Sequence, residues 1–201
     1  RLATSLSMPT ADARTPQPTY GTSASSSSPW IVPSSHSGPC MTGCPARFDI
    51  PGFLTEVSGG NDRRSAEIAS DFLALPAALG RICPRLCEQR CHRCEAEAAL
   101  SVGGLHRFAA DRDLASGERY IPHRDKASGK RVAIVGAGPA GLTAAYFLLR
   151  RGHGAVIFDA HDAPGGMLRY GIPAFRLPHA VLDQEIDVIG LLGGEFRMGR
   201  R

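Results

Sequence analysis

RVAIVGAGPAGLTAAYFLLRRGHGAVIFDAHDAPGG, residues 131–166, is the stretch that decides the fold of this chain. Its apolar start, Arg131–Val135, is typical of a buried parallel strand and runs directly into a glycine-rich turn. A helical repeat of apolar residues follows, and a second apolar run at residues 155–158 ends in the acidic Asp159. Strand, glycine turn, helix, strand and acid in this order predict a βαβ unit that binds a dinucleotide.

Each position of the turn GAGPAG meets a physical requirement of a bound dinucleotide. Gly136 allows the tight turn out of the strand, Gly138 lets the backbone approach a pyrophosphate, and Gly141 lets helix and strand pack closely. The helix that begins near Pro139 and Ala140 would direct its free N–H groups and its positive dipole end at the anion. These five residues are therefore predicted to bind the pyrophosphate.

Asp159, at the end of the second strand, is expected to accept hydrogen bonds from a ribose diol. Its charge would repel a 2′-phosphate, which argues against NADP at this particular site. A glycine-rich turn in an unrelated α/β protein is the other interpretation of the motif. It is the weaker one, because both strands, the helix and the acid are all in place.

The composition is that of an ordinary globular protein, and it argues against several classes. Of the 201 residues, 43% are hydrophobic and 21% are charged, and the net charge is +4. Because the basic residues are scattered rather than clustered, no nucleic-acid-binding surface is expected. No apolar stretch reaches the ~20 residues that a membrane-spanning helix needs, so no membrane span is expected either.

The chain divides into three regions. Residues 1–38 are rich in serine, threonine and proline, which predicts a disordered or non-native leader. Residues 39–125 contain helical patterns and every cysteine, and residues 126–201 contain the βαβ unit. Because the chain starts at an arginine and stops after a short third strand, we expect a fragment whose dinucleotide-binding domain is truncated. Helices are expected at residues 51–58, 64–75, 84–93, 104–115 and 178–192, and the third strand at residues 195–198.

The six cysteines fall into two groups, one at Cys40 and Cys44 and the other between Cys83 and Cys94. Disulfides would need an oxidising compartment, and a nicotinamide or flavin domain indicates a reducing one. Zinc sites favour paired CxxC motifs, of which the chain has one, and buried inert thiols are a third interpretation. Cys-x3-Cys-Pro is typical of the end of a bacterial ferredoxin motif. Iron–sulfur ligation therefore fits the pattern best.

The second cysteine group has a spacing that suits one helix face. Pro84 is favourable at the first position of a helix and would place Cys83 at its cap. Cys87, Cys91 and Cys94 would then follow at i, i+4 and i+7. We therefore expect a helix here that presents aligned thiolates to a cluster.

With these motifs together, residues 39–201 resemble the small (β) subunit of NADPH-dependent glutamate synthase and the N-terminal part of dihydropyrimidine dehydrogenase. The shared motifs are PCMTGCPARFDIPGFL, GRICPRLCEQRC, GGLHRFAADR, VAIVGAGPAGL and GGMLRYGIPAFRLP. The resemblance implies an α plus α/β fold, in which a helical iron–sulfur domain precedes the first βαβ part of a Rossmann-like FAD-binding domain. It also implies two [4Fe–4S] clusters, FAD at the first fingerprint, and NAD(P)H at a second fingerprint outside this fragment.

For one cluster, the resemblance implies Cys44, Cys83 and Cys87 as ligands, with a fourth ligand at the position of His106. A histidine on a short helix has a second interpretation, as a solvated or hydrogen-bonded side chain. Imidazole is nevertheless an adequate iron ligand, as in Rieske centres. Both interpretations of His106 stay open at this point.

For the other cluster, the resemblance implies Cys40 and Cys91 together with two cysteines upstream of Cys40. Those two positions hold Val32 and Ser35 in this chain. Cys94 offers one substitute thiol, which does not fill two vacancies. One cluster is therefore expected, and the second is in doubt.

One interpretation of the segment that follows Asp159 is a flexible loop without a specific role. It would lie over the carboxyl edge of the sheet, where ligands of open α/β folds bind. The resemblance implies that this loop wraps the flavin, which favours FAD over NAD at the first fingerprint. The residues it would bring to the cofactor are Gly165, Gly166, Met167, Leu168 and Arg169, the last as a pyrophosphate or flavin contact.

Together, these expectations predict that the chain is part of an NAD(P)H-dependent iron–sulfur flavoprotein oxidoreductase in the cytoplasm. Electrons would pass from NAD(P)H to FAD, then to a [4Fe–4S] cluster, and on to a larger catalytic subunit or a fused downstream domain. No catalytic acid or base is visible, because the flavin performs the hydride chemistry, and the fragment alone is expected to be inactive. The alternative is a non-enzymatic, cluster-bearing docking module with a vestigial Rossmann half.

Overall fold

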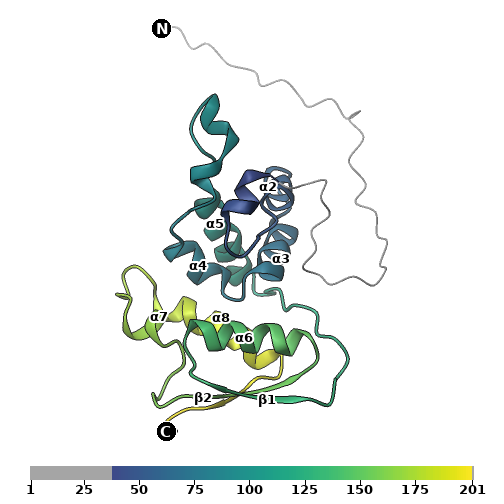
Figure 1. Ribbon diagram of the computed structural model, residues 1–201, viewed down its shortest axis with the longest axis vertical. Helices are drawn as coiled ribbons and strands as arrows, with labels where there is room; N and C mark the ends of the chain where they lie inside the picture. Colours follow the sequence, from purple (N-terminus) through teal and green to yellow (C-terminus); the bar gives the residue numbers. More distant parts are fainter. Residues whose placement is uncertain (1–37, 201) are drawn as a thin grey trace. The chain divides into compact units, whose positions relative to one another are not determined.

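The computed structural model describes residues 38–200. The leader expected at residues 1–38 falls almost wholly outside the described residues. Helices come first along the chain, and a small α/β part follows (Figure 1), as the sequence predicted. The helical part contains α1 (Pro39–Gly43), α2 (Ile50–Ser58), α3 (Asp62–Phe72), α4 (Pro76–Ile82), two 3-10 turns η2 (Glu88–Arg90) and η3 (His92–Glu95), and α5 (Val102–Ala115). The α/β part contains β1 (Arg131–Val135), α6 (Pro139–Arg150), β2 (Gly154–Phe158), α7 (Met167–Tyr170), α8 (His179–Leu191) and β3 (Glu195–Arg197).

The three strands form a parallel sheet in the order β1-β2-β3. Val135 is paired in register with Phe158 at the carboxyl end of β1, and Ile157 with Phe196 between β2 and β3. Helices α6 and α8 cover one face of this sheet (Figure 1). The predicted strands therefore exist within one residue of their expected bounds, and the glycine turn lies at the carboxyl edge of the sheet. The expectation that the first strand is buried is wrong, because exposed residues alternate with half-buried ones along β1 and Val135 at its end is exposed.

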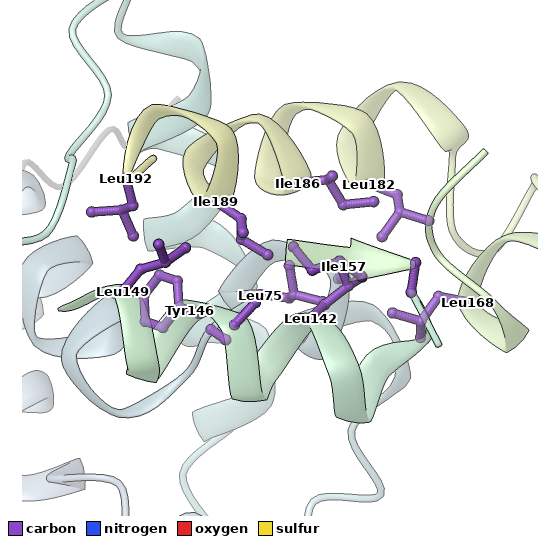
Figure 2. Close-up of a cluster of buried hydrophobic side chains, with 14 of the residues drawn as sticks. Leu75, Leu142, Tyr146, Leu149, Ile157, Leu168, Leu182, Ile186, Ile189 and Leu192 are labelled. Atoms are coloured by element: carbon purple, nitrogen blue, oxygen red, sulfur yellow. The ribbon is translucent and has the colours of Figure 1, made fainter. Parts of the chain in front are cut away.

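The core of the α/β part lies between α6, α8 and the sheet (Figure 2). The face of α6 that carries Leu142, Ala145, Tyr146 and Leu149 is fully buried, as its helical spacing predicts. Ile157 from β2 completes the layer between helices and sheet. Burial of this apolar stripe is the main force that holds α6 against the sheet.

The helical part has a second core, built around Phe48 and Phe53, whose ring centroids are 5.1 Å apart. The side chain of Asp49 accepts a hydrogen bond from the Gly52 N–H at 3.1 Å and so caps the start of α2. Among the residues that the structure describes, no helix is long and apolar enough to span a membrane.

The helical part and the α/β part share apolar packing and polar contacts. Leu75, which precedes α4, packs into the same core as α6 and α8 (Figure 2). The Tyr146 hydroxyl donates to the Ser70 carbonyl at 2.6 Å, and the Arg150 guanidinium binds the Asp71 carboxylate at 2.6 Å. The two parts therefore form a continuous structure rather than two bodies on a linker.

The prediction of a helix over residues 84–93 is wrong. Helix α4 ends at Ile82, and Cys83 is its C-cap rather than the N-cap of a following helix. Arg85 has φ +58°, a left-handed conformation that interrupts a right-handed helix, and Cys91 is extended. Only two short 3-10 turns form in this segment, so Cys87, Cys91 and Cys94 do not share a helix face.

Candidate cofactor sites

The glycine turn after β1 brings backbone atoms into contacts that only glycine permits. A Cβ on Gly141 would lie 1.9 Å from the Gly136 carbonyl oxygen, so α6 approaches the turn more closely than any side chain would allow. Gly138 is the N-cap of α6, and Pro139 occupies its first turn. Since Gly138 has no side chain to cap the helix, the first N–H groups of α6 remain available to an anion.

Asp159 lies beside this turn, with both carboxylate oxygens in hydrogen bonds. Its Oδ2 accepts from the Ala137 N–H at 2.7 Å, and its Oδ1 accepts from the His161 N–H at 2.9 Å. The His161 Nδ1 also lies 2.8 Å from Oδ1, and the imidazole stacks on Tyr170 at 4.6 Å between centroids. The hydrogen bonds from His161 and Ala137 lower the pKa of Asp159 to about 2. A ribose diol would therefore meet an ionised carboxylate that also fixes the turn.

The loop predicted to wrap a cofactor packs directly on the glycine turn. The Gly165 N–H donates to the Ala137 carbonyl at 2.8 Å, and a Cβ on Gly166 would lie 2.6 Å from the Gly138 Cα. The segment that follows is the short helix α7 rather than an irregular loop. A cofactor at the turn would therefore meet this loop as well.

Two side chains of α7 are already engaged within the protein. Arg169 donates from Nε to the Pro164 carbonyl at 2.6 Å and forms an ion pair with Asp183. Leu168 is buried in the core of the α/β part, whereas Met167 is 69% exposed. Contact of Arg169 with a pyrophosphate stays a prediction, and it would require the guanidinium to be shared with these partners.

A second candidate site lies in the helical part, in a cavity of about 290 Å³. Three thiols and one imidazole line it, from Cys44, Cys83, Cys87 and His106. The rest of the wall is mainly apolar and consists of Pro45, Ala46, Phe48, Leu73, Leu79, Ile82, Pro84, Leu86, Val102 and Gly103. The structure thus brings together four side chains that are up to 62 positions apart in the sequence.

His106 is buried, with 5% of its surface exposed, so the interpretation as a solvated side chain is wrong. Its Nε2 has no hydrogen-bond partner among the described residues. Burial lowers the pKa of His106 to about 4, which keeps the imidazole neutral near pH 7. An unpartnered, neutral imidazole nitrogen on the wall of a cysteine-lined cavity is chemically suited to bind a metal.

The thiols of this cavity lie close enough to influence one another. Burial raises the pKa of Cys87 to about 11, with smaller contributions to that rise from the neighbouring Cys44 and Cys83. Because thiolates are the metal-binding form, a cationic centre would have to compensate this cost. No three His, Cys, Asp or Glu side chains within residues 38–200 converge tightly enough for one metal ion. A polynuclear cluster, whose ligands are spread over several iron atoms, suits the wider arrangement better.

The approach of α4 to α5 places Cys83 near His106. A Cβ on Gly80 would lie 2.7 Å from the Arg107 Cα, so the two helices cross with almost no side chain between them. Beyond the end of α4, the Arg85 N–H points at the Cys83 sulfur at 3.4 Å. With a cluster bound, this N–H would affect the reduction potential, as hydrogen bonds to cluster sulfurs do.

The remaining cysteines lie away from this cavity. Cys40 is half-buried, and burial raises its pKa, with smaller effects from Cys91 and Cys44. Cys94 is exposed. All six cysteines are free thiols. The positions Val32 and Ser35, which matter for a second cluster, lie outside the described residues.

Comparison with known protein families gives a match over each of the two parts of the chain. Residues 34–118 match the dihydropyrimidine dehydrogenase domain II, 4Fe–4S cluster family, and residues 134–181 match the NAD(P)-binding Rossmann-like domain. The NAD-dependent dihydropyrimidine dehydrogenase subunit PreT of Escherichia coli K12 is 40% identical over 160 residues. The chain is therefore similar, over most of its length, to PreT and to the glutamate synthase small chain.

The chain spans only part of the length of these relatives. It is 39% identical over 184 residues to the beta subunit of the NADP(+)-dependent formate dehydrogenase of Moorella thermoacetica, which covers 81% of this chain and 26% of that protein. The NADPH glutamate synthase small chain of E. coli K12 is 38% identical and covers 79% of the chain, and PreT also covers 79%. The chain spans 34% and 39% of those two relatives.

Sequence reasoning missed two features of these sites. His161 donates to Asp159 and stacks on Tyr170, and the spacing Asp159-x-His161 was a signal for a local hydrogen bond to the backbone. Glu185, a buried carboxylate on α8, was not predicted either. In the sequence it is one of several acids on a helix, and nothing local marks it as buried.

Proposed function

We propose that the chain holds a [4Fe–4S] cluster in the cavity of the helical part and passes electrons between that cluster and FAD bound at the glycine turn. The observation that carries this proposal is the cavity itself, which is lined by three thiols and by His106, whose Nε2 has no hydrogen-bond partner among the described residues. Cys44, Cys83, Cys87 and His106 would be the cluster ligands. The match to a 4Fe–4S domain family over these residues supports the assignment.

At the second site, FAD would supply the exchange between hydride transfer and single-electron transfer. The N–H groups at the start of α6 would bind its pyrophosphate, and Asp159 would orient its ribose. The loop that carries Gly165 and Gly166 would cover the cofactor from the other side. The protein contributes binding, orientation and shielding, and none of the residues in this proposal acts as an acid or base.

The names of the relatives support a proposal for the wider electron path. Their names describe NAD- or NADP-dependent dehydrogenase, oxidoreductase and synthase subunits. We infer that NAD(P)H binds outside this chain and delivers electrons to FAD, and that a larger catalytic subunit or a fused domain receives them from the cluster. We also infer one cluster rather than two, since Cys40 and Cys91 supply only two ligands for a second.

Anaerobic reconstitution of the chain with iron, sulfide and FAD tests the proposal. We expect about four irons per chain, the content of one [4Fe–4S] cluster, together with one bound FAD. About eight irons would contradict the single-cluster assignment. A chain that binds neither iron nor flavin would contradict the proposed function.

Replacing His106 should separate ligation from a packing role. His106→Cys should retain the cluster and lower its reduction potential, because a thiolate adds negative charge where the imidazole is neutral. His106→Ala should make the cluster labile. A redox titration followed by electron paramagnetic resonance measures both effects. If His106→Ala keeps full iron content and an unchanged potential, the fourth ligand must be sought at Cys91 or Cys94.

Replacing Asp159 should weaken FAD binding. Asp159→Ala removes a charged acceptor of ribose hydrogen bonds, for which a loss of about 1–3 kcal/mol is usual. Isothermal titration of the apo chain with FAD measures the change. Asp162→Ala, which removes a neighbouring exposed carboxylate, is the matched control and should bind FAD normally. Tight binding of NAD with no binding of FAD would contradict the assignment.

A further inference from the structure

Glu185 is a carboxylate buried at the contact between the α/β part and the helical part. It lies on α8 with 3% of its surface exposed. Its Oε1 accepts from the Ala77 N–H at 2.5 Å and its Oε2 accepts from the Ala78 N–H at 2.8 Å. Both donors belong to the first turn of α4, whose N-cap residue, Leu75, has no polar side chain. Helix α8 thus supplies a cap that α4 lacks in its own sequence.

Helix α4 connects this cap to the cluster cavity. It is only seven residues long, and its C-cap is Cys83, one of the proposed ligands. Arg81, in its last turn, binds both oxygens of Asp111 on α5 at 2.7 and 3.0 Å. Since α5 also carries His106, the cap at one end of α4 and the ion pair at the other fix two sides of the cavity.

The charge of Glu185 is sensitive to its surroundings. Burial raises its pKa, the hydrogen bonds from Ala78 and Ala77 oppose part of that rise, and the net result is a pKa of about 8. Glu185 also borders a cavity of about 30 Å³, which is large enough for a water molecule. The charged or titratable groups that face it are Arg81 on α4, Asp111 and Asp113 on α5, Tyr146 on α6, and Arg119 and Tyr120 after α5.

We propose that Glu185 is a positioning residue, which holds Cys83 through α4 and so couples the dinucleotide-binding part to the cluster. This inference rests on the proposed function, since it needs a cluster at Cys83. Partners outside the first ligand shell commonly orient metal ligands in this way. The carboxylate also places a titrating charge at the end of the helix that leads to the cluster.

Three variants of the full chain, reconstituted anaerobically, test the inference. Glu185→Ala removes the cap and should lower iron affinity by about 10-fold, the lower end of the loss seen when a direct partner of a metal ligand is removed, because Glu185 acts on Cys83 only through α4. Glu185→Gln keeps the shape of the side chain and one hydrogen-bond acceptor. This variant should therefore retain most of the iron content that Glu185→Ala loses. Asp187→Asn removes an exposed carboxylate from the same helix and should behave as the unaltered chain.

The cluster's reduction potential, measured against pH, gives a readout that a purely structural role would not change. Deprotonation of Glu185 adds negative charge, which disfavours an added electron, so the potential should fall as pH rises through about 8. Glu185→Gln should abolish this step, and Asp187→Asn should keep it. If Glu185→Gln keeps the step, or Glu185→Ala keeps unaltered iron affinity and potential, the inference is wrong. If the unaltered chain holds no cluster, the proposed function fails with it.

Discussion

Cys87→Ser should abolish the [4Fe–4S] cluster. Cys87 is buried among Cys44 and Cys83 on the wall of the cavity, and a serine hydroxyl stays protonated there because burial disfavours an alkoxide. With one of four ligands lost, iron content after anaerobic reconstitution should fall to background, and the visible absorption of the cluster should disappear. Thermal stability should fall as well, since the binding free energy of a structural metal centre contributes to folding.

Cys94→Ser is the matched control for this variant. Cys94 is exposed and does not line the cavity, although it lies in the same cysteine group. Its replacement should leave iron content and absorption unchanged. A Cys87→Ser chain that retains a complete cluster would show that the ligand set is wrong. A Cys94→Ser chain that loses its cluster would show that the exposed cysteines supply a ligand.

Gly141→Ala should disrupt the dinucleotide-binding part. The new methyl group would lie 1.9 Å from the Gly136 carbonyl oxygen and 3.2 Å from Cγ2 of Ile134, and the first of these is a backbone atom that cannot rotate away. Helix α6 would have to move off β1, at a cost of about 3 kcal/mol, near the upper end for overpacking. Urea unfolding should measure the lost stability, and FAD titration should measure the lost binding.

Gly190→Ala provides the comparison for this variant. Gly190 lies in the last turn of α8, and a Cβ there would meet no described atom within 4 Å. Alanine is favoured over glycine in a helix by about 0.5–1 kcal/mol, so this variant should be neutral or slightly more stable. Equal effects of the two substitutions would show that the close contact at Gly141 does not control the fold.

The βαβ unit could be predicted from the sequence because its signals are local. Arg131–Val135, the glycine turn and the apolar stripe of α6 are contiguous in the sequence. The spacing of the residues within each of these segments indicates a strand, a tight turn and an amphipathic helix. The apolar face of α6 is therefore buried as predicted. The segment after Cys83 was predicted wrongly, because a proline next to a cysteine is compatible with the start of one helix or the end of another.

The conformation of that segment depends on contacts from elsewhere in the chain. Arg85 adopts φ +58° while its side chain lies over Gly103 at the start of α5, where a Cβ would be 3.1 Å from its Cγ. The sequence of residues 83–94 alone does not predict this contact. Helical periodicity alone therefore favoured a continuous helix where the structure has two 3-10 turns.

The sequence by itself determined that a dinucleotide unit follows a cysteine-rich helical region, since glycine, acid and thiol positions are properties of residue type and spacing. Only the tertiary structure decided which polar groups are buried. His106 lies on α5 and Glu185 on α8, and each loses its water because distant segments pack around it. Glu185 binds backbone groups 107 and 108 positions away. Desolvation and hydrogen bonding between residues so far apart in the sequence arise from tertiary packing. The local spacing of residues therefore does not predict them.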